Sequence, residues 1–462
     1  MILGMATASS LRDLPSVDRL SRHPRLRRWG PGGAVATAAR SILDTERARR
    51  RQDSSRPRDL DELATAVDAW LERRLHPGPH RVINATGVVI HTNLGRAPLS
   101  ADARAAAEEA SGYCDLEYDA ASGKRGSRQE HIAPLLTSLT GAADAVVVGN
   151  NAAAVLLVLR ALCHGREVLV SRGEAVEIGG GFRIPEVMRE SGARMVDVGT
   201  TNRTRARDYE TALTPRTVAI VRVHPSNFAI TGFTERPSTS ECADVAHRHG
   251  LILIEDAGSG ALHDPAAIDR RLGDEPVLAQ LIAAGADVVT ASGDKLCGGP
   301  QAGLIVGRAD LLAKVRRHPL MRALRPDKLV IAALAATLAG HLGGHAIAEV
   351  PVLRMLSRDL ESLEATARQW QERLAAEGIH ADVEQTDSAV GGGSLPGATL
   401  PTACLTLKCK PERMLAALRR GTPPVIARAA EGKVWLDPRT VSEEESAELI
   451  NAVAAASRFA LP

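Results

Sequence analysis

Lysine, aromatic residues and paired cysteines are scarce in this sequence of 462 residues. Aromatic residues make up 2% of the chain, which leaves almost no platform on which the bases of a single strand could stack. The six cysteines form no CxxC pair, and no HExxH motif or spaced His/Cys cluster occurs, so we expect no metal site. No apolar run reaches the about 18 residues of a membrane-spanning helix, and the N-terminus has no signal-peptide pattern. The sequence therefore predicts a cytoplasmic protein with no membrane segment and no disulfide framework.

The charge of the chain is distributed unevenly. Its net charge is +2, but residues 1–58 hold thirteen arginines against five acidic residues, a charge of +8, so residues 59–462 carry −6. A compact basic segment on a mildly acidic body indicates a polyanionic partner such as a nucleic acid. A solvated arm that binds nothing would have the same charge, so the pattern alone leaves both interpretations open.

The N-terminal part of the sequence has helical patterns. We expect helices over residues 12–28, 34–52 and 60–75, and the stretch His76-Pro77-Gly78-Pro79 ends the last of them. This proline-rich stretch is the first expected domain boundary. Residues 1–80 are therefore predicted to form a basic helical domain with its linker.

Short apolar runs rich in β-branched residues alternate with helical stretches from residue 81 to about 345. Such runs, apolar on both faces and separated by helices, predict a parallel sheet covered by helices on both sides, an α/β fold. Ligands of such sheets bind at the C-terminal ends of the strands. We therefore expect residues 81–345 to form the large catalytic domain. The runs are 145–149, 168–171, 195–199, 218–224, 251–256, 288–292 and 303–307.

The C-terminal part of the sequence mixes both kinds of pattern. We expect a long helix over residues 356–377, a glycine-rich turn at 391–393 and paired strands at 403–408 and 433–437. Residues 346–462 are therefore predicted to form a smaller α+β domain. No internal repeat and no low-complexity tract is present.

One of the seven lysines differs from the others in its setting. Lys295, in VVTASGDKLCGGPQAG, stands three residues after Ser292, where a buried strand is expected to end, and glycines surround it. A lysine in such a loop, made nucleophilic by a lowered pKa, is the pattern of a residue that bonds the aldehyde of pyridoxal phosphate (PLP). Ser292 is a candidate to bond the cofactor's phosphate.

Three side chains earlier in the chain fit the rest of such a site. Asp256 ends the buried run 251–256, where a carboxylate needs a partner such as the protonated ring nitrogen of PLP; the alternative is a cap for a following helix. Asn227, in the stretch His224-Pro225-Ser226-Asn227, is a candidate to bond the phenolic oxygen of the ring. His224 is expected against the ring face, with a buried structural histidine as an equal alternative.

A phosphate group is best held by backbone N–H donors at the start of a helix. Gly149-Asn150-Asn151-Ala152 follows an expected strand and opens an apolar helix, so Asn150 and Asn151 are candidate cofactor-binding residues. Such a turn is weak evidence alone. Its order along the chain before Asn227, Asp256 and Lys295 makes a PLP site the most specific interpretation.

Nine stretches of the sequence add a closer resemblance. They are 83–100, 118–128, 148–159, 171–204, 223–234, 256–262, 292–307, 318–328 and 391–397, and they include INATGVVIHTNLGRAPLS and HPLMRALRPDK. In this order they resemble the family of bacterial selenocysteine synthases, the L-seryl-tRNA(Sec) selenium transferases. Cys297 and Pro326 depart from the family pattern, which has an apolar and an aliphatic residue there, and residues 1–80 match only in general character.

The resemblance implies a fold-type I, PLP-dependent transferase with an N-terminal tRNA-binding domain. It also implies that the protein assembles into a ring-shaped homo-oligomer, a ring of dimers that makes a decamer. It implies that Lys295 carries PLP and that Asp294 assists catalysis. It also implies that Arg96, Arg322 and Arg325 bind the phosphate of selenophosphate, for which the planar guanidinium is suited. On a helix, Arg322 and Arg325 would lie on one side; exposed charges on a solvated face are the alternative.

The implied reaction converts L-seryl-tRNA(Sec) into L-selenocysteinyl-tRNA(Sec). Lys295 removes the α-proton, the β-hydroxyl leaves as water to give an aminoacrylyl-tRNA, and selenium from selenophosphate then adds. An alternative is a PLP-dependent lyase of the same superfamily that acts on a small phosphorylated amino compound and shares Lys295 and Asp256. A non-catalytic tRNA-binding protein is a further alternative, against which the set of Asn227, Asp256 and Lys295 argues.

Overall fold

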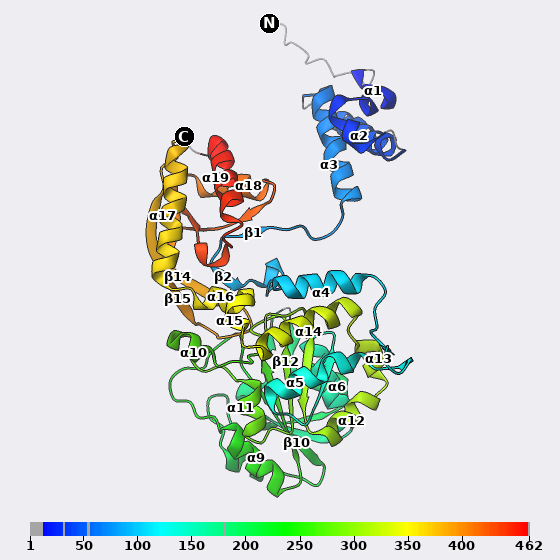
Figure 1. The fold of residues 1–462 in the computed structure, drawn as a ribbon, viewed down its shortest axis with the longest axis vertical. Coiled ribbons are helices and arrows are strands. Elements are labelled where there is room, and N and C mark those ends of the chain that lie inside the picture. Colours follow the sequence, from blue (N-terminus) through cyan, green and yellow to red (C-terminus); the bar gives the residue numbers. More distant parts are fainter. Residues whose placement is uncertain (1–12, 31–32, 53–55, 180, 461–462) are drawn as a thin grey trace. The chain divides into compact units, whose positions relative to one another are not determined.

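The computed structural model of the chain describes residues 13–30, 33–52, 56–179 and 181–460. The chain divides into two compact units, residues 1–81 and 82–462 (Figure 1). Each unit has a hydrophobic core of its own. Among the described residues, no helix is long and apolar enough to cross a membrane.

The N-terminal unit is helical. Its elements are α1 Val17–Ser21, the 3-10 helix η2 Pro24–Trp29, α2 Gly33–Gln52 and α3 Leu60–Leu75. The helices expected over 34–52 and 60–75 are confirmed. The single helix expected over 12–28 is wrong, because Pro24 has no N–H to continue α1 and the chain restarts as η2; residue 12 lies outside the described residues.

The core and the surface of this unit differ in composition. Leu20, Leu43 and Leu63, from different helices, are fully buried together. Most arginines of the unit are exposed. An exception is Arg49, whose guanidinium lies 2.6 Å from the buried carboxylate of Glu46 and, by hydrogen bonding, lowers the pKa of that carboxylate to about 2. The unit therefore presents a basic surface over a small apolar core.

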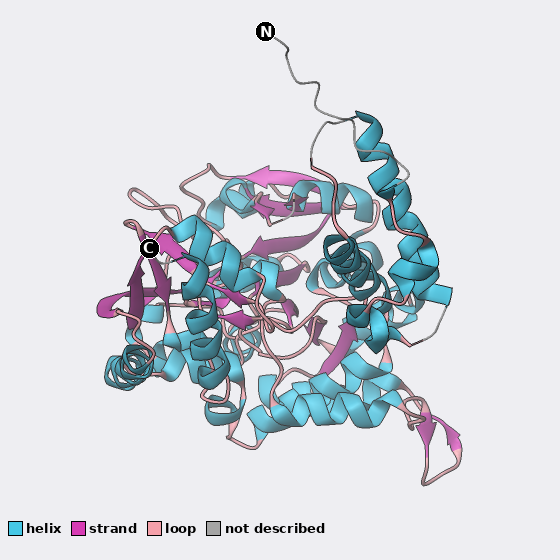
Figure 2. Cartoon of the chain, turned by 90° about the horizontal axis from the view of Figure 1, so that it is seen from above, coloured by secondary structure: helices cyan, strands magenta, loops and turns pink. Residues whose placement is uncertain are grey.

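All seven runs that were expected to be strands form one sheet in the unit 82–462. The order is β5-β13-β12-β11-β10-β6-β9, and helices flank the strands in Figure 2. The strands are β5 Asp144–Val148, β6 Glu167–Ser171, β9 Arg194–Val198, β10 Thr217–Val223, β11 Ile252–Gly258, β12 Val288–Ser292 and β13 Gly303–Gly307. The parallel-rich central sheet, and with it the expected α/β fold class, is confirmed.

One strand of the sheet runs against the others. β13 pairs antiparallel with both β12 and β5, so the expectation that every run is parallel is wrong for residues 303–307. The connection over residues 293–302 is too short for the crossover that a parallel neighbour requires, which takes a dozen or more residues. The reversal brings Gly303 so close to the turn after β5 that a Cβ atom there would lie 2.1 Å from the carbonyl oxygen of Asn150.

Helices cover both faces of this sheet, as expected. One core contains residues of α5, α9, α11 and α14, and the other contains residues of α6, α7 and α12. Neighbouring residues of one strand, such as Val146 and Val147, belong to opposite cores, as the alternation of side chains along a strand requires. The helices are α5 Ala133–Thr140, α6 Asn151–Cys163, α7 Ile184–Ser191, α9 Thr239–Arg248, α11 Leu278–Ala283, α12 Ala309–Arg317 and α14 Lys328–Leu342.

A second sheet of five strands, in the order β17-β18-β15-β14-β2, joins four strands of the C-terminal part to β2, which lies much earlier in the chain. The pairing expected for residues 403–408 and 433–437 is confirmed by β15 and β18, which are antiparallel. The helix expected over 356–377 is interrupted, because Asp359 is extended and caps a new helix, α17, through the N–H of Ser362. The elements are β2 Val88–Ile90, α16 Pro351–Ser357, α17 Leu360–Ala376, β14 Asp382–Gly391, β15 Thr399–Lys408, α18 Pro411–Arg419, β17 Arg428–Ala430, β18 Lys433–Leu436 and α19 Ser446–Ala460.

The remaining elements of this unit are short. The strand pairs are β1 Ile83–Asn84 with β16 Val425–Ile426, β3 Tyr118–Asp119 with β4 Lys124–Arg125, and β7 Glu177–Ile178 with β8 Phe182–Arg183. The helices are α4 Ala101–Ser111, α8 Ala206–Thr211, α10 Pro265–Ile268, α13 Leu320–Leu324 and α15 Ala346–Glu349. The 3-10 helices are η3 Thr92–Leu94, η4 Arg128–His131, η5 Arg172–Glu174, η6 Arg270–Leu272 and η7 Pro438–Thr440.

Candidate active site

Lys295 lies in the loop between β12 and β13, and its side chain is enclosed. It is 6% exposed. Its Nζ donates hydrogen bonds to the carbonyl oxygens of Gly393, at 2.9 Å, and Gly258, at 3.3 Å. The amine is therefore held where β11 ends and where the glycine-rich turn 391–393 passes over it.

The surroundings of Lys295 make its ammonium group easier to deprotonate than that of an exposed lysine. Burial lowers the pKa of the ammonium group, the nearby carboxylate of Asp256 partly opposes this, and Arg96 lowers the pKa further. A buried amine with a lowered pKa is a better nucleophile and base near neutral pH than an exposed lysine.

Gly393 makes this position of the lysine possible. Its φ of +86° lies in the left-handed region, which residues with a side chain rarely adopt. A Cβ atom there would lie 2.8 Å from the Nζ of Lys295. The glycine-rich turn is therefore part of the wall around the amine, a role that the sequence pattern did not reveal.

Asp256 lies within β11 and is 3% exposed. Its Oδ1 accepts hydrogen bonds from Asn151 Nδ2, at 2.8 Å, and Thr290 Oγ1, at 3.1 Å. Burial raises the pKa of this carboxyl group, while the hydrogen bond from Asn151 and the charge of Lys295 lower it. The strand continues to Gly258, so Asp256 does not cap a following helix, and the alternative considered for it is excluded.

The two candidate asparagines at the start of α6 have different contacts. Asn150 caps the helix, because its side chain accepts the N–H of Ala153 at 2.8 Å. Asn151 donates to Asp256, and its Oδ1 is buried without a hydrogen-bond partner. Such an orphaned buried atom costs free energy unless a ligand bonds it. Ser292 is buried as the last residue of β12.

The structure brings His224 to this group of residues but not Asn227. The backbone N–H of His224 donates to the carbonyl oxygen of Asp256 at 2.9 Å. Its ring Nε2 lies 3.3 Å from Oε2 of Glu275, without the direction of a hydrogen bond. Asn227 is exposed and donates to the carbonyl oxygen of Glu177 at 3.1 Å, and none of the described hydrogen bonds joins it to Lys295 or Asp256.

Arg96 and Asp294 form an ion pair beside Lys295. The guanidinium Nη1 of Arg96 donates to Oδ2 of Asp294 at 2.6 Å. Arg96 is one of the few non-glycine residues with a positive φ, 65°, and its side chain is 35% exposed. Backbone strain of this kind gathers at functional sites. The pair therefore combines a fixed cation with access from solvent.

The other two candidate arginines do not share a helical face. α13 ends at Leu324, and Arg325 is extended, with φ −64° and ψ 139°. The reason is the departure noted at Pro326, because a residue before proline avoids the helical conformation. Arg322 and Arg325 are exposed, and Arg325 lies 3.6 Å from Glu117; none of the described ion pairs or hydrogen bonds joins either of them to Lys295.

α13 is nevertheless attached to the start of α6. The N–H of Gly149, at the end of β5, donates to the carbonyl oxygen of Leu324 at 2.8 Å. Arg325 therefore follows directly after the residue that contacts the expected phosphate loop. Glu275 is a neighbour that sequence analysis missed: it is buried, accepts the N–H of Leu395 at 3.1 Å and leaves Oε1 without a partner.

The residues around Lys295 fit PLP. A buried amine, a buried carboxylate held by two donors and a helix start with an unpaired asparagine oxygen match the aldehyde, the ring nitrogen and the polar substituents of this cofactor. Among the described residues, no group of His, Cys, Asp and Glu could hold a metal ion.

Comparison with known proteins gives consistent matches. A family model described as L-seryl-tRNA selenium transferase matches residues 82–442. A protein of Moorella thermoacetica named L-seryl-tRNA(Sec) selenium transferase is 46% identical over 461 residues, 97% of each chain. One of the same name from Geobacter sulfurreducens is 45% identical over 454 residues, 95% of this chain and 98% of that one. The solved structure of D-glucosaminate-6-phosphate ammonia-lyase is similar in fold, with a TM-score of 0.57 and 23% identity over 84% of this chain and 98% of that one.

Proposed function

The chain belongs to the family of L-seryl-tRNA selenium transferases, and we propose that it converts L-seryl-tRNA(Sec) into L-selenocysteinyl-tRNA(Sec) with PLP as cofactor and selenophosphate as selenium donor. The observation that carries the proposal is the buried Lys295, whose amine lies between Gly258 and Gly393 with a lowered pKa. The similarity to the ammonia-lyase, at 23% identity, concerns the fold alone and does not favour a lyase.

The cofactor supplies one part of the chemistry. When bound, PLP withdraws electrons from the α-carbon of the seryl group, so that the β-hydroxyl can leave as water and selenium can take its place. Lys295 Nζ would hold the aldehyde end until the amino group of the seryl ester takes its place there, and the released amine would then remove the α-proton. Asp256, fixed by Asn151 and Thr290, holds the proton on the ring nitrogen.

Arg96 and Asp294 serve the selenium donor. Asp294 fixes the guanidinium of Arg96 beside Lys295, and the other N–H groups of that guanidinium bind the donor's phosphate oxygens. Arg322 and Arg325 join them as further phosphate ligands by resemblance to the family. Their exposure supports a role toward a ligand that arrives from solvent.

Substrate binding and assembly complete the proposal. Residues 1–80, with exposed arginines such as Arg25 and Arg27, bind the tRNA; residues 81–345 form the catalytic domain and residues 346–462 the small domain. The protein acts in the cytoplasm as a ring-shaped homo-oligomer. Asn150, Ser292, His224 and Asn227 contact the cofactor, Asn227 after a change in the contact that it now makes with Glu177.

The test is to incubate the protein with seryl-tRNA(Sec), PLP and selenophosphate and to identify the amino acid on the tRNA. We expect selenocysteine, and we expect none with the Lys295→Ala variant. Filter binding of the tRNA at low salt is the second measurement. Absence of tRNA binding together with turnover of a small phosphorylated amino compound would overturn the proposal in favour of a lyase.

A further inference from the structure

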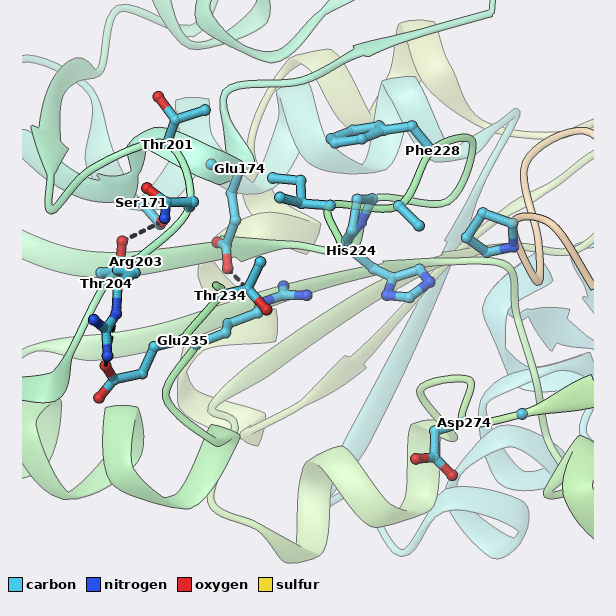
Figure 3. A pocket seen from close by; sticks show the side chains of 18 of the residues that line it. Ser171, Glu174, Thr201, Arg203, Thr204, His224, Phe228, Thr234, Glu235 and Asp274 are labelled. Carbon is cyan, nitrogen blue, oxygen red and sulfur yellow. Dashed lines mark hydrogen bonds and ion pairs between the residues drawn. The ribbon is translucent and has the colours of Figure 1, made fainter. Parts of the chain in front are cut away.

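A cavity of about 380 Å³, whose lining residues are drawn in Figure 3, shares His224 with the candidate active site. It is formed by loops that follow β6, β9 and β10, together with residues 272–274 and 395–398. His224 and Leu395 line it. Both residues also touch the surroundings of Lys295: His224 bonds the backbone of Asp256, and Leu395 follows the turn whose Gly393 carbonyl accepts from the lysine.

The cavity is separate from the residues that fit the cofactor. None of the side chains expected around the ring nitrogen and the phosphate lines it, namely Asn150, Asn151, Asp256 and Ser292, and neither does Lys295. His224 is common to both. A ligand in the cavity would therefore contact His224, which both sites share, and would be a neighbour of the cofactor rather than the cofactor itself.

The charges on the cavity wall do not suit an anion. Arg203 is paired with Glu235 at 2.7 Å, and Arg236 with Glu174 at 2.7 Å, so both cations are neutralised. Asp274 adds a carboxylate for which the described residues offer no ion-pair partner. Selenophosphate or any other small phosphate would be repelled by this balance.

The other groups on the wall suit a flat, neutral molecule with polar edges. The aromatic ring of Phe228 and the apolar side chains of Ile230 and Leu395 contribute surface for stacking and burial. Thr201 and Thr234 contribute hydroxyl groups that can donate or accept hydrogen bonds. In size and in this mixture of apolar walls with few polar groups, the cavity is typical of small-molecule sites.

We infer that this cavity binds the 3′-terminal nucleoside of the aminoacyl-tRNA. The inference rests on the proposed function, in which Lys295 acts on a serine esterified to the terminal ribose. That ribose must come within one ester linkage of the reacting carbons, so its nucleoside must lie in the space next to Lys295. The cavity adjoins this space through His224 and Leu395, and its partly aromatic wall, in which both arginines are paired, accepts a base while the phosphates stay outside.

The first experiment blocks the cavity from its rim. Ala229 lines the cavity and is exposed, whereas Thr231 is exposed on the same loop and does not line it, so Ala229→Trp and Thr231→Trp are matched variants. We expect Ala229→Trp to raise the KM for seryl-tRNA(Sec) about tenfold or more, the scale of one lost base-stacking contact. The KM for selenophosphate and the amount of PLP fixed to Lys295 by borohydride should stay unchanged, and Thr231→Trp should change none of these values.

The second experiment uses the unaltered protein. A tRNA(Sec) transcript that ends in 2-aminopurine riboside should change its emission on binding, and Ala229→Trp, unlike Thr231→Trp, should abolish the change. No emission change at saturation, an unchanged KM in Ala229→Trp, or loss of fixed PLP in that variant would each overturn the inference. Failure of the proposed function is distinguishable, because the wild-type protein would then form no selenocysteinyl-tRNA whatever the emission shows.

Discussion

Lys295 and Arg439 are both cations buried in the unit 82–462, yet their surroundings differ. Arg439 is 2% exposed, and its guanidinium donates to the carbonyl oxygens of Met355, at 2.8 Å, and Pro401, at 2.6 Å, and to the hydroxyl of Ser388, at 3.1 Å. The ammonium of Lys295 has two carbonyl acceptors, on Gly258 and Gly393. All three guanidinium nitrogens of Arg439 therefore donate hydrogen bonds. The ammonium of Lys295 has three N–H groups for these two acceptors, which leaves one N–H for another partner.

The comparison separates a structural cation from a chemical one. A guanidinium stays protonated at any pH a protein meets, so Arg439 can only tie together the segments that accept its hydrogen bonds. An ammonium whose pKa is lowered by burial can lose its proton, so Lys295 can become a nucleophile or a base. Burial is common to both, and the ability to deprotonate distinguishes them.

The largest expected effect is the loss of turnover when Lys295, the cation that can deprotonate, is replaced. Lys295→Ala should lower turnover by at least about 10³-fold, because the group that bonds the cofactor and moves the proton is gone. The free energy of unfolding should not fall, because a partly desolvated charge is removed. Lys314→Ala, at an exposed position, is the control. Undiminished turnover, or PLP fixed by borohydride on another residue, would contradict the assignment.

The opposite result is expected at Arg439. Arg439→Met should destabilise the protein by about 3–5 kcal/mol, because the carbonyl groups and the nearby Asp437 lose their buried partner. Denaturant unfolding measures this change, and Arg373→Met, at an exposed position, should stay within about 0.5 kcal/mol of the wild type. If the Arg439→Met variant were as stable as the control, the hydrogen bonds of Arg439 would not contribute to the free energy of unfolding, and its structural role would be refuted.

His341 is a third buried basic side chain, and it extends the comparison because burial favours its neutral form. Its Nε2 lies 2.8 Å from the carbonyl oxygen of Cys297, and its Nδ1 lies 2.9 Å from Nε2 of His263. Burial lowers its pKa to about 4. Between pH 6.5 and 4 the unfolded chain therefore binds the proton that the folded chain does not, and stability falls as the pH falls.

The expected slope from this histidine is up to about 1.4 kcal/mol per pH unit. His341→Gln, which can still donate to the Cys297 carbonyl, should remove this part of the acid sensitivity in urea unfolding measured across the range. His249→Gln, at an exposed position, should keep it. Stability curves of the wild type and His341→Gln that run parallel would show that His341 does not titrate as described.

The smallest effect is expected for the exposed arginines of the N-terminal unit. Replacing Arg25 and Arg27 with alanine should weaken tRNA binding and lower the slope of log K against log salt by about 1–2, one phosphate contact for each. Arg28 is the control, because its guanidinium is already paired with Asp68 and Glu72, and Arg28→Ala should change the slope less. If the slope of log K against log salt were the same in the wild type and in all variants, these arginines would not contact the tRNA phosphates, and the proposed tRNA-binding role of the N-terminal unit would be contradicted.

Sequence patterns predicted the strands well because each buried run is locally recognisable. All seven expected runs form the central sheet, and α3 has the expected ends. The direction of β13 was missed because it depends on the length of the preceding loop rather than on the strand's own residues. The breaks at Pro24 and Asp359 were missed although proline and a capping aspartate are local signals.

The candidate site was predicted in part. Lys295, Asp256 and Asn151 lie together as expected, since each stands near or just after the C-terminal end of a strand of one sheet. Glu275 was missed because it stands in a polar segment, DEP, that looks exposed in the sequence, and only the tertiary fold buries it. Outside the site, the burial of Arg439 in DPRT was missed for the same reason. The shared face of Arg322 and Arg325 failed because Pro326 ends the helix.

The antiparallel strand β13 links the loop that carries Lys295 to the turn that carries Asn150 and Asn151. Gly303 lies against the carbonyl group of Asn150, and β13 pairs with both β12 and β5. A movement of the loop that carries Lys295 would therefore break hydrogen bonds to β5, the strand that precedes Asn150 and Asn151. Amide protons on both segments should therefore exchange with deuterium at one common, slow rate, as a single cooperative unit. These segments therefore form a rigid part of the site. We expect the movements that the reaction needs to occur in the tRNA and in the outer loops.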